Sequence, residues 1–213
     1  MICVSLAEES LADCLEALKQ LDCAEIRFDK MRLTLADIPK IFSLRKTLIA
    51  TCRPGSHDDA YRKALLLKAI ESGATFVDVE LESGIAYREE IIAKAKPSGC
   101  RVIVSFHDHA KTPERHELEG IVDSCFQAGA DIAKIACMTH SGRDNARLLG
   151  LLDDTRKVVA LGMGHKGRIT RIVSPLLGSP FTFASLSKGK ETAAGQIDRK
   201  TLEGLLQNLA ERD

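Results

Sequence analysis

A lysine interrupts one of the apolar segments of this chain. Residues 131–136 read Asp-Ile-Ala-Lys-Ile-Ala, so Lys134 stands among side chains typical of a buried β-strand. Burial disfavours a charged ammonium unless a partner neutralises it, and it lowers the pKa of a lysine that has no such partner. A neutral amine attacks carbonyl carbons and forms a Schiff base. Two interpretations of Lys134 are open: an imine-forming nucleophile, or a structural lysine paired with a carboxylate such as Glu80.

The preceding apolar segment ends in a histidine. Residues 101–107 read Arg-Val-Ile-Val-Ser-Phe-His, which places His107 at the end of the neighbouring predicted strand. An imidazole titrates near neutral pH and serves as a general base, although a lone histidine is more often structural. An iminium on Lys134 would acidify the adjacent carbon, and His107 would remove its proton. Elimination, aldol cleavage and isomerisation share this step, and the residues alone do not choose among them.

Charged residues also interrupt or end several other apolar segments. Parallel strands that are buried on both faces read as nearly all apolar, so these charges are costly unless they meet in one polar centre. Arginines in such a centre would hold a carboxylate in bidentate geometry. For Glu25 and Arg27, which share a strand face, an ion pair that only stabilises the fold is the competing interpretation. The residues expected to form the centre are Glu25, Arg27, Arg53, Glu80, His107 and Lys134.

Eight short apolar segments alternate with longer amphipathic ones. The apolar segments, each of strand length, are 2–6, 24–29, 47–53, 75–81, 101–107, 131–136, 157–163 and 181–186. Strict alternation predicts a parallel sheet with helices outside it, and eight units are the number that closes a (β/α)8 TIM barrel of the α/β class. An open doubly wound sheet is the alternative, but no Gly-x-Gly-x-x-Gly follows the first segment. Without a linker or a break in composition, residues 1–213 are expected to form a single catalytic TIM-barrel domain.

The helices expected between these strands have recognisable ends. They cover residues 10–21 and the regions near 58–72, 85–96, 113–128, 141–154 and 198–210. Ser10 and Asp198 are good N-caps, and Pro113 suits the first position of its helix. Gly73 and Gly129 are typical of positions just beyond a helix C-terminus.

The composition excludes several partners and compartments. Thirty basic residues balance thirty acidic ones without a block of one sign, so neither a nucleic acid nor a membrane surface is an expected partner. No apolar run approaches the length of a membrane span, and the N-terminal residues do not read as a signal peptide. The seven cysteines are odd in number and form no Cys-x-x-Cys, which favours reduced, buried thiols in a cytoplasmic protein.

Several short motifs, in this order, resemble those of the type I 3-dehydroquinate dehydratase family over essentially the whole chain. Their order and spacing carry the resemblance more than any one of them does. The motifs are Glu25-Ile26-Arg27-Phe28-Asp29, Thr51-Cys52-Arg53, Asp78-Val79-Glu80, Ser105-Phe106-His107-Asp108, Lys134-Ile135-Ala136, Met163-Gly164 with Gly167 and Arg171, and Ala194-Gly195-Gln196.

The resemblance implies an enzyme of the shikimate pathway of aromatic amino-acid biosynthesis. Lys134 would form a Schiff base with the C3 ketone of 3-dehydroquinate. His107 would take the C2 proton and return it to the departing C1 hydroxyl, giving syn loss of water and 3-dehydroshikimate. No metal and no organic cofactor are implied, and the family is commonly a homodimer.

The resemblance also implies binding residues. Glu25 and Arg27 would hold ring hydroxyls, while Arg53 and Arg171 would line the site, with Arg171 on the substrate carboxylate. The lid that closes over the substrate would contain Thr192 and Gln196, and Met163 would shield the iminium from water.

The chain departs from the family pattern at position 57, in the lid, and before Arg171, where Thr170 replaces the usual serine. Such enzymes commonly carry a glutamate that orients the catalytic histidine where this chain has His57, and Asp58 and Glu80 are candidates to take over that support. The lid, commonly Ser-Ala-Pro-Gly-Gln, reads Thr192-Ala193-Ala194-Gly195-Gln196, which keeps the hydroxyl and loses the stiffening proline.

Two other functions fit parts of the pattern. A Schiff-base aldolase barrel would need a phosphate site, for which Gly164-His165-Lys166-Gly167 is the candidate segment. A non-catalytic barrel that binds a shikimate-like ligand would keep the pocket without the chemistry, although the presence of Lys134, His107 and Arg171 together argues against it.

Overall fold

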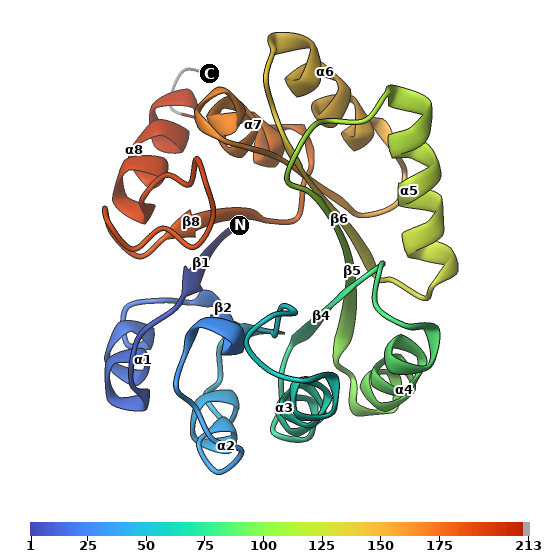
Figure 1. The fold of residues 1–213 in the computed structure, drawn as a ribbon. Helices are drawn as coiled ribbons and strands as arrows, with labels where there is room; N and C mark the ends of the chain where they lie inside the picture. The colour runs from blue at the N-terminus through green and yellow to red at the C-terminus, as the bar shows by residue number, and fades with distance from the viewer. Residues whose placement is uncertain (211–213) are drawn as a thin grey trace. The chain divides into compact units, whose positions relative to one another are not determined.

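The computed structural model describes residues 1–210, in which eight β-strands alternate with eight α-helices (Figure 1). The strands are β1 (Ile2–Leu6), β2 (Cys23–Arg27), β3 (Thr47–Thr51), β4 (Phe76–Glu80), β5 (Arg101–Asp108), β6 (Ile132–Met138), β7 (Val158–Met163) and β8 (Thr182–Ser185). The helices are α1 (Leu11–Leu18), α2 (Ile38–Phe42), α3 (Asp59–Glu71), α4 (Ile85–Ala95), α5 (Arg115–Gln127), α6 (Gly142–Gly150), α7 (Arg168–Val173) and α8 (Arg199–Ala210). None of these helices is long and apolar enough to cross a membrane.

The strand order confirms the expected fold class. The eight strands belong to one sheet with the order β7-β6-β5-β4-β3-β2-β1-β8. Strands that follow each other in sequence are therefore neighbours in the sheet, and β8 lies beside β1. A doubly wound sheet would instead reverse its order at a switch point. The chain has the α/β fold class of a (β/α)8 TIM barrel.

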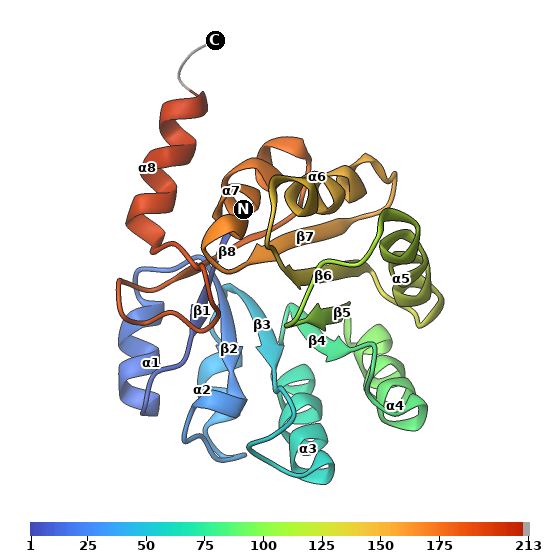
Figure 2. The same cartoon turned by 45° about the horizontal axis from the view of Figure 1, so that its top comes forward.

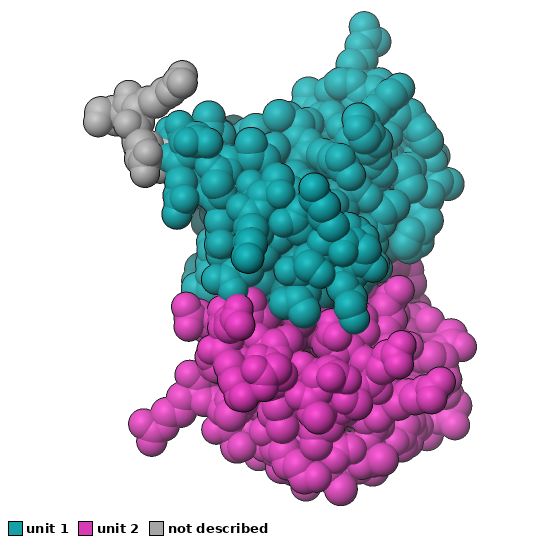
Figure 3. Space-filling view, turned by 90° about the vertical axis from the view of Figure 1, so that its left-hand side faces the viewer, with its two compact units in different colours: residues 1–5, 106–124, 132–213 teal, residues 6–105, 125–131 magenta. Residues whose placement is uncertain are grey.

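The described residues fall into two compact units (Figure 3). Unit 1 consists of Met1–Ser5, Phe106–Ser124 and the described part of Ile132–Asp213, and unit 2 consists of Leu6–Ser105 and Cys125–Asp131. Each unit has its own strands and covering helices. The expectation that residues 1–213 act as one domain stays a prediction, and residues 211–213 lie outside the described residues.

In unit 2, parallel register aligns the carboxyl ends of the strands. Arg27 of β2 pairs with Thr51 of β3, Thr51 pairs with Asp78 of β4, and Glu80 pairs with Ser105 of β5. Helices α3 and α4 pack against each other and against β3 and β4 (Figure 2). Polar residues at the ends of β2–β5 are therefore neighbours across the sheet.

In unit 1, two strand pairs carry the remaining candidate residues. In β6, Lys134 pairs with Val159 of β7, and Met138 pairs with Met163. Strand β1 pairs with β8, so that Ser5 lies beside Ser185. Helix α7 packs against β7, β8 and α8.

Most of the predicted helix ends are confirmed. The Ser10 side chain accepts a hydrogen bond from the Asp13 amide at 3.2 Å, and Asp198 accepts one from the Thr201 amide at 3.1 Å. Gly73 and Gly129 both have φ of +100° beyond their helices, which favours glycine. The position predicted for Pro113 is wrong, because α5 begins only at Arg115.

Two short helices were not expected from the sequence. Helix α2 has five residues and α7 has six. Segments of one to two turns do not repeat an apolar period often enough to be recognised. The omission matters because α7 carries Arg171.

All seven cysteines are free and buried. Burial is the main cause that raises the pKa of five thiols from the ordinary 9.0 to about 12; these are Cys14, Cys52, Cys100, Cys125 and Cys137. This accords with the expectation of reduced packing thiols.

We predict that the fold loses stability as the pH rises above about 9. The thiols of the unfolded chain ionise near pH 9, whereas those five thiols in the fold keep their protons until about pH 12. Their contribution to stability is complete below pH 9 and is lost progressively towards pH 12. Urea unfolding at pH 8 and pH 10.5 should show a clearly lower midpoint at the higher pH. Equal midpoints would show that thiol burial does not control alkaline stability.

Candidate active site

A network of charges joins Arg53, which follows β3, to side chains of β4 and β5. Arg53 donates to both carboxylate oxygens of Asp78 at 2.9 and 2.8 Å, to Glu80 Oε1 at 2.6 Å and to Ser105 Oγ at 2.8 Å. The Asp78 side chain is fully buried and that of Arg53 is 15% exposed. Burial opposes the charge of Arg53, but the carboxylates of Asp78 and Glu80 outweigh it and raise the pKa of the guanidinium. Arg53 is therefore a fixed cation in a rigid bidentate setting.

A second arginine, which the sequence analysis missed, completes this network. Arg62 of α3 is buried, donates to the Cys52 carbonyl at 3.1 and 2.9 Å, and donates to Glu80 Oε2 at 3.0 Å. Its guanidinium lies over the Tyr87 ring, 5.3 Å from the centroid. A charged residue on the buried stripe of α3, three residues before Leu65, was the available signal.

Glu25 and Arg27 have different partners from those expected. Glu25 is buried and accepts a hydrogen bond from Thr51 Oγ1 at 3.0 Å. Arg27 forms its ion pair with Asp29, donating to the two carboxylate oxygens at 3.0 and 2.6 Å. The interpretation that Glu25 and Arg27 form an ion pair with each other is thus wrong. The carboxylate of Glu25 nevertheless contributes to the raised pKa of Arg27, which burial opposes.

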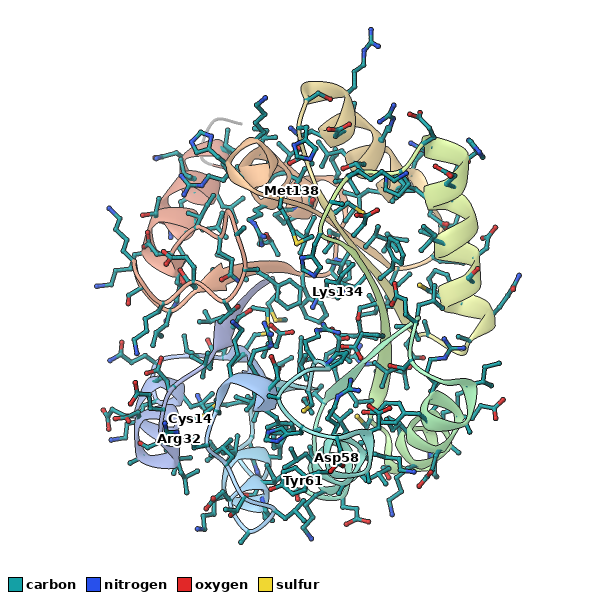
Figure 4. The ribbon with its side chains drawn as sticks, in the orientation of Figure 1. Cys14, Arg32, Asp58, Tyr61, Lys134 and Met138 are labelled. Carbon is teal, nitrogen blue, oxygen red and sulfur yellow. The ribbon has the colours of Figure 1, made fainter. Side chains whose placement is uncertain are left out.

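The segment around position 57 forms the N-terminal cap of α3. The His57 ring packs edge-on against Tyr61 with 5.1 Å between centroids. Asp58 caps the helix by accepting from the Tyr61 amide at 2.8 Å, and Figure 4 labels both residues. Glu80 pairs with Arg53 and Arg62. Both carboxylates considered as replacements for the missing glutamate therefore have other partners in unit 2.

In unit 1, Lys134 of β6 lies against an aromatic ring. Lys134, which Figure 4 labels, is 5% exposed, and its Nζ is 4.1 Å from the centroid of the Phe183 ring. This is a cation–π geometry, in which the face of the ring attracts the ammonium. Phe183 was missed by the sequence analysis, because an aromatic residue in a strand is usually core.

Arg171 of α7 is buried without a carboxylate partner among residues 1–210. The residue is 2% exposed and its Nη1 donates to the Phe183 carbonyl at 3.1 Å, while its buried Nε has no hydrogen-bond partner. Burial lowers the pKa of Arg171 to about 10, and the nearby charge of Arg168 adds to this effect. The side chain is still protonated at neutral pH, so it is a buried cation with an open donor.

His107 occupies the penultimate position of β5 and is half-buried. Its ring lies nearly parallel to that of His109, with 6.2 Å between the centroids. Asp108 accepts hydrogen bonds from the amides of Ala110 and Lys111 at 2.8 and 2.9 Å, which turns the chain immediately after the strand. The end of β5 is therefore fixed beside the candidate base.

The predicted lid is a loop folded around Gln196. Gln196 Oε1 accepts from the amides of Thr192 and Ala193 at 2.6 and 3.3 Å, and its Nε2 donates to Ser5 Oγ at 3.3 Å. The Gly164 amide, next to the buried Met163, donates to the Ala194 carbonyl at 3.1 Å. The loops after β7 and β8 are thus joined.

Close backbone packing explains the glycines after β7. A Cβ on Gly167 would lie 2.3 Å from the carbonyl carbon of Gly162, and Gly164 has φ of +78°. These contacts explain the glycines of the Gly164–Gly167 segment without a phosphate, so the segment gives the aldolase interpretation no specific support.

The comparisons with known proteins agree with the geometry. The family model described as type I 3-dehydroquinase matches residues 2–213. A 3-dehydroquinate dehydratase from Methanococcus maripaludis is 38% identical over 224 residues, covering 97% of this chain and 99% of the relative. The crystal structure of 3-dehydroquinate dehydratase from Geobacillus kaustophilus is 26% identical with a TM-score of 0.88, covering 100% of this chain and 91% of that one. A type I 3-dehydroquinate dehydratase from Clostridium difficile, crystallised with covalent modified comenic acid, is 25% identical with a TM-score of 0.87, covering 100% and 92%.

We predict that Arg62→Met destabilises the protein by about 3 kcal/mol, because it breaks a buried ion pair and leaves the Cys52 carbonyl without its donor. Lys63→Met is the matched control, since the neighbouring Lys63 pairs with Glu90 on the surface and its loss should cost less than about 1 kcal/mol. Urea unfolding of both variants measures the difference. Equal losses would mean that the Arg62 network carries no special stability.

We predict that Gly195→Ala releases the lid from the loop after β7. A Cβ at this position, where φ is +79°, would lie 2.2 Å from the Gly164 carbonyl oxygen. Gly189 has a similar φ of +83° with nothing within 4 Å, so Gly189→Ala carries the backbone strain without the clash. Hydrogen exchange of the Gly164 amide should accelerate at least about tenfold in Gly195→Ala and change little in the control. Unchanged exchange in Gly195→Ala would contradict the joined-loop geometry.

Proposed function

The chain belongs to the type I 3-dehydroquinase family and is a 3-dehydroquinate dehydratase, an enzyme of the shikimate pathway, and from this premise we propose that it eliminates water through an imine on Lys134. The observation that carries the proposal is the burial of Lys134 against the Phe183 ring. In this setting the amine is shielded from bulk water and from competing hydrolysis of an imine.

The first step forms the imine. Lys134 Nζ attacks the C3 carbonyl carbon of 3-dehydroquinate, and the carbonyl oxygen leaves as water. The resulting iminium withdraws electrons from the bond between C2 and its hydrogen, so the C2 proton becomes acidic. Met163, buried at the end of β7, is the proposed wall that keeps water from the iminium.

The second step transfers one proton twice. His107 takes the C2 proton, and the electron pair forms an enamine with the iminium nitrogen as electron sink. The enamine expels the C1 hydroxyl, to which His107 returns the proton, so that water leaves from the same face. Hydrolysis of the remaining imine consumes one water and frees Lys134 and 3-dehydroshikimate. The net change is the loss of one water.

The proposed binding roles depend on which arginines already have a carboxylate partner in the protein. Arg53 and Arg62 are neutralised by carboxylates, whereas Arg171 has an open Nε, which supports Arg171 as the residue that binds the substrate carboxylate. Glu25 and Arg27 are proposed to hold ring hydroxyls, and Arg53 to line the site. Gln196 is proposed to act by holding the Thr192–Ala193 backbone as a lid. Glu80, through its ion pairs with Arg53 and Arg62, and His57 are proposed as supporting residues.

We further propose that the protein acts as a homodimer of single-domain chains in the cytoplasm. The support is the family resemblance, together with seven buried cysteines that form no disulfide.

Trapping the imine tests the proposal directly. The protein is incubated with 3-dehydroquinate, reduced with borohydride and analysed by peptide mass spectrometry. We predict a single reduced adduct on Lys134 and none in Lys134→Met, since reduction fixes only an imine. An active enzyme without an adduct on Lys134 would contradict the mechanism.

The variant His107→Ala separates imine formation from proton transfer. It should still give the trapped adduct while its turnover falls about 10²- to 10⁴-fold, the contribution typical of a general base. Turnover at the wild-type rate in this variant would show that another group is the base.

A further inference from the structure

A buried serine hydroxyl at the carboxyl end of β8 has no hydrogen-bond partner. Ser185 is 0% exposed, and its Oγ is one of the few buried polar side-chain atoms in residues 1–210 that remain unsatisfied. A buried hydroxyl without a partner is costly, and such atoms in native structures call for an explanation. The mechanism proposed above does not use Ser185.

The alternation of β8 places Ser185 on the same face as the ring that contacts the lysine. Residues two apart in a strand share a face, so Ser185 and Phe183 are on one side. The Phe183 ring lies against Lys134 Nζ on that side. Thr182, on the other face, donates from its hydroxyl to the Arg171 carbonyl at 2.7 Å. Ser185 therefore lies two residues beyond Phe183 on the same face, at the carboxyl end of β8. In TIM barrels the active site lies at the carboxyl ends of the strands.

The same strand end anchors the lid. Ser185 pairs in register with Ser5, whose Oγ accepts the hydrogen bond from Gln196 Nε2 at 3.3 Å. The Ser185 amide donates to the Ile197 carbonyl at 3.1 Å, directly after the lid sequence. Ser185 thus lies at the base of the loop that is proposed to close over the substrate.

A second unsatisfied donor belongs to Arg171, which contacts the backbone of β8. Arg171 Nη1 donates to the carbonyl of Phe183, and its Nε has no partner. Arg171 Nε and Ser185 Oγ are thus two buried, unsatisfied polar groups of unit 1, and an oxygen-rich anion offers acceptors for donors of this kind. 3-Dehydroquinate, a hydroxylated keto acid, has this chemistry.

We propose that Ser185 is a further substrate-binding residue, whose hydroxyl hydrogen-bonds an oxygen of bound 3-dehydroquinate. The inference rests on the proposed function of this site. It predicts that the hydroxyl contributes to substrate affinity and nothing to the stability of the unliganded fold, because it has no partner there.

The variant Ser185→Ala tests this inference by steady-state kinetics and thermal unfolding. KM should rise about tenfold, which corresponds to about 1.4 kcal/mol and to the loss of one hydrogen bond. Since the hydroxyl does not take part in the chemistry, kcat should stay within about threefold. The melting temperature should be unchanged or higher, because the variant removes an unsatisfied buried group.

Ser179→Ala is the matched control, from the loop that precedes the same strand. Ser179 is also buried, but its Oγ donates to the Phe181 carbonyl at 2.9 Å. This variant should lower the melting temperature and leave KM unchanged. A wild-type KM in Ser185→Ala, with or without a lower melting temperature, would overturn this inference and leave the proposed function intact. A wild-type chain that does not convert 3-dehydroquinate would overturn the proposed function and the inference with it.

Discussion

A guanidinium can be buried at moderate cost only when carboxylates or carbonyls occupy its donors, and Arg53, Arg62 and Arg171 differ in this respect. Arg53 and Arg62 bind Asp78 and Glu80, and the pKa of each is raised against the effect of burial. Arg171 binds only the Phe183 carbonyl among the described residues, and burial lowers its pKa to about 10. Its position is explained when an anionic ligand supplies the missing acceptor.

The two units therefore differ in whether their buried polar groups have partners within the protein. In unit 2, the register of β2–β5 brings charged side chains together so that they satisfy one another before any ligand arrives. A preformed network of this kind holds its arginines rigidly and needs no reorganisation during a reaction. In unit 1, Arg171 Nε and Ser185 Oγ remain open, and the Gly164–Ala194 backbone hydrogen bond joins the loops after β7 and β8. We interpret the open groups as the part of the site that the substrate completes.

Much of this could be predicted from the sequence, and the omissions have physical reasons. The alternation of apolar and amphipathic segments was enough to predict the barrel. Charges within apolar segments were enough to select Lys134 and Arg53 as candidate site residues. Helix α7 was too short to show a period, and Pro113 lay outside the helix it was expected to begin. The partner of Arg27, and the importance of Arg62, Phe183 and Ser185, depend on which side chains the register brings into contact. Spacing along one segment does not contain that information.

The central claim is that the substrate carboxylate completes the buried Arg171. The most direct measurement is a crystal structure of the borohydride-reduced adduct of the enzyme with 3-dehydroquinate. We predict a covalent bond from Lys134 Nζ to the former C3 and a carboxylate oxygen within about 3.2 Å of Arg171 Nε. A carboxylate bound to Arg53 or Arg27, with Arg171 Nε still lacking an acceptor, would contradict it.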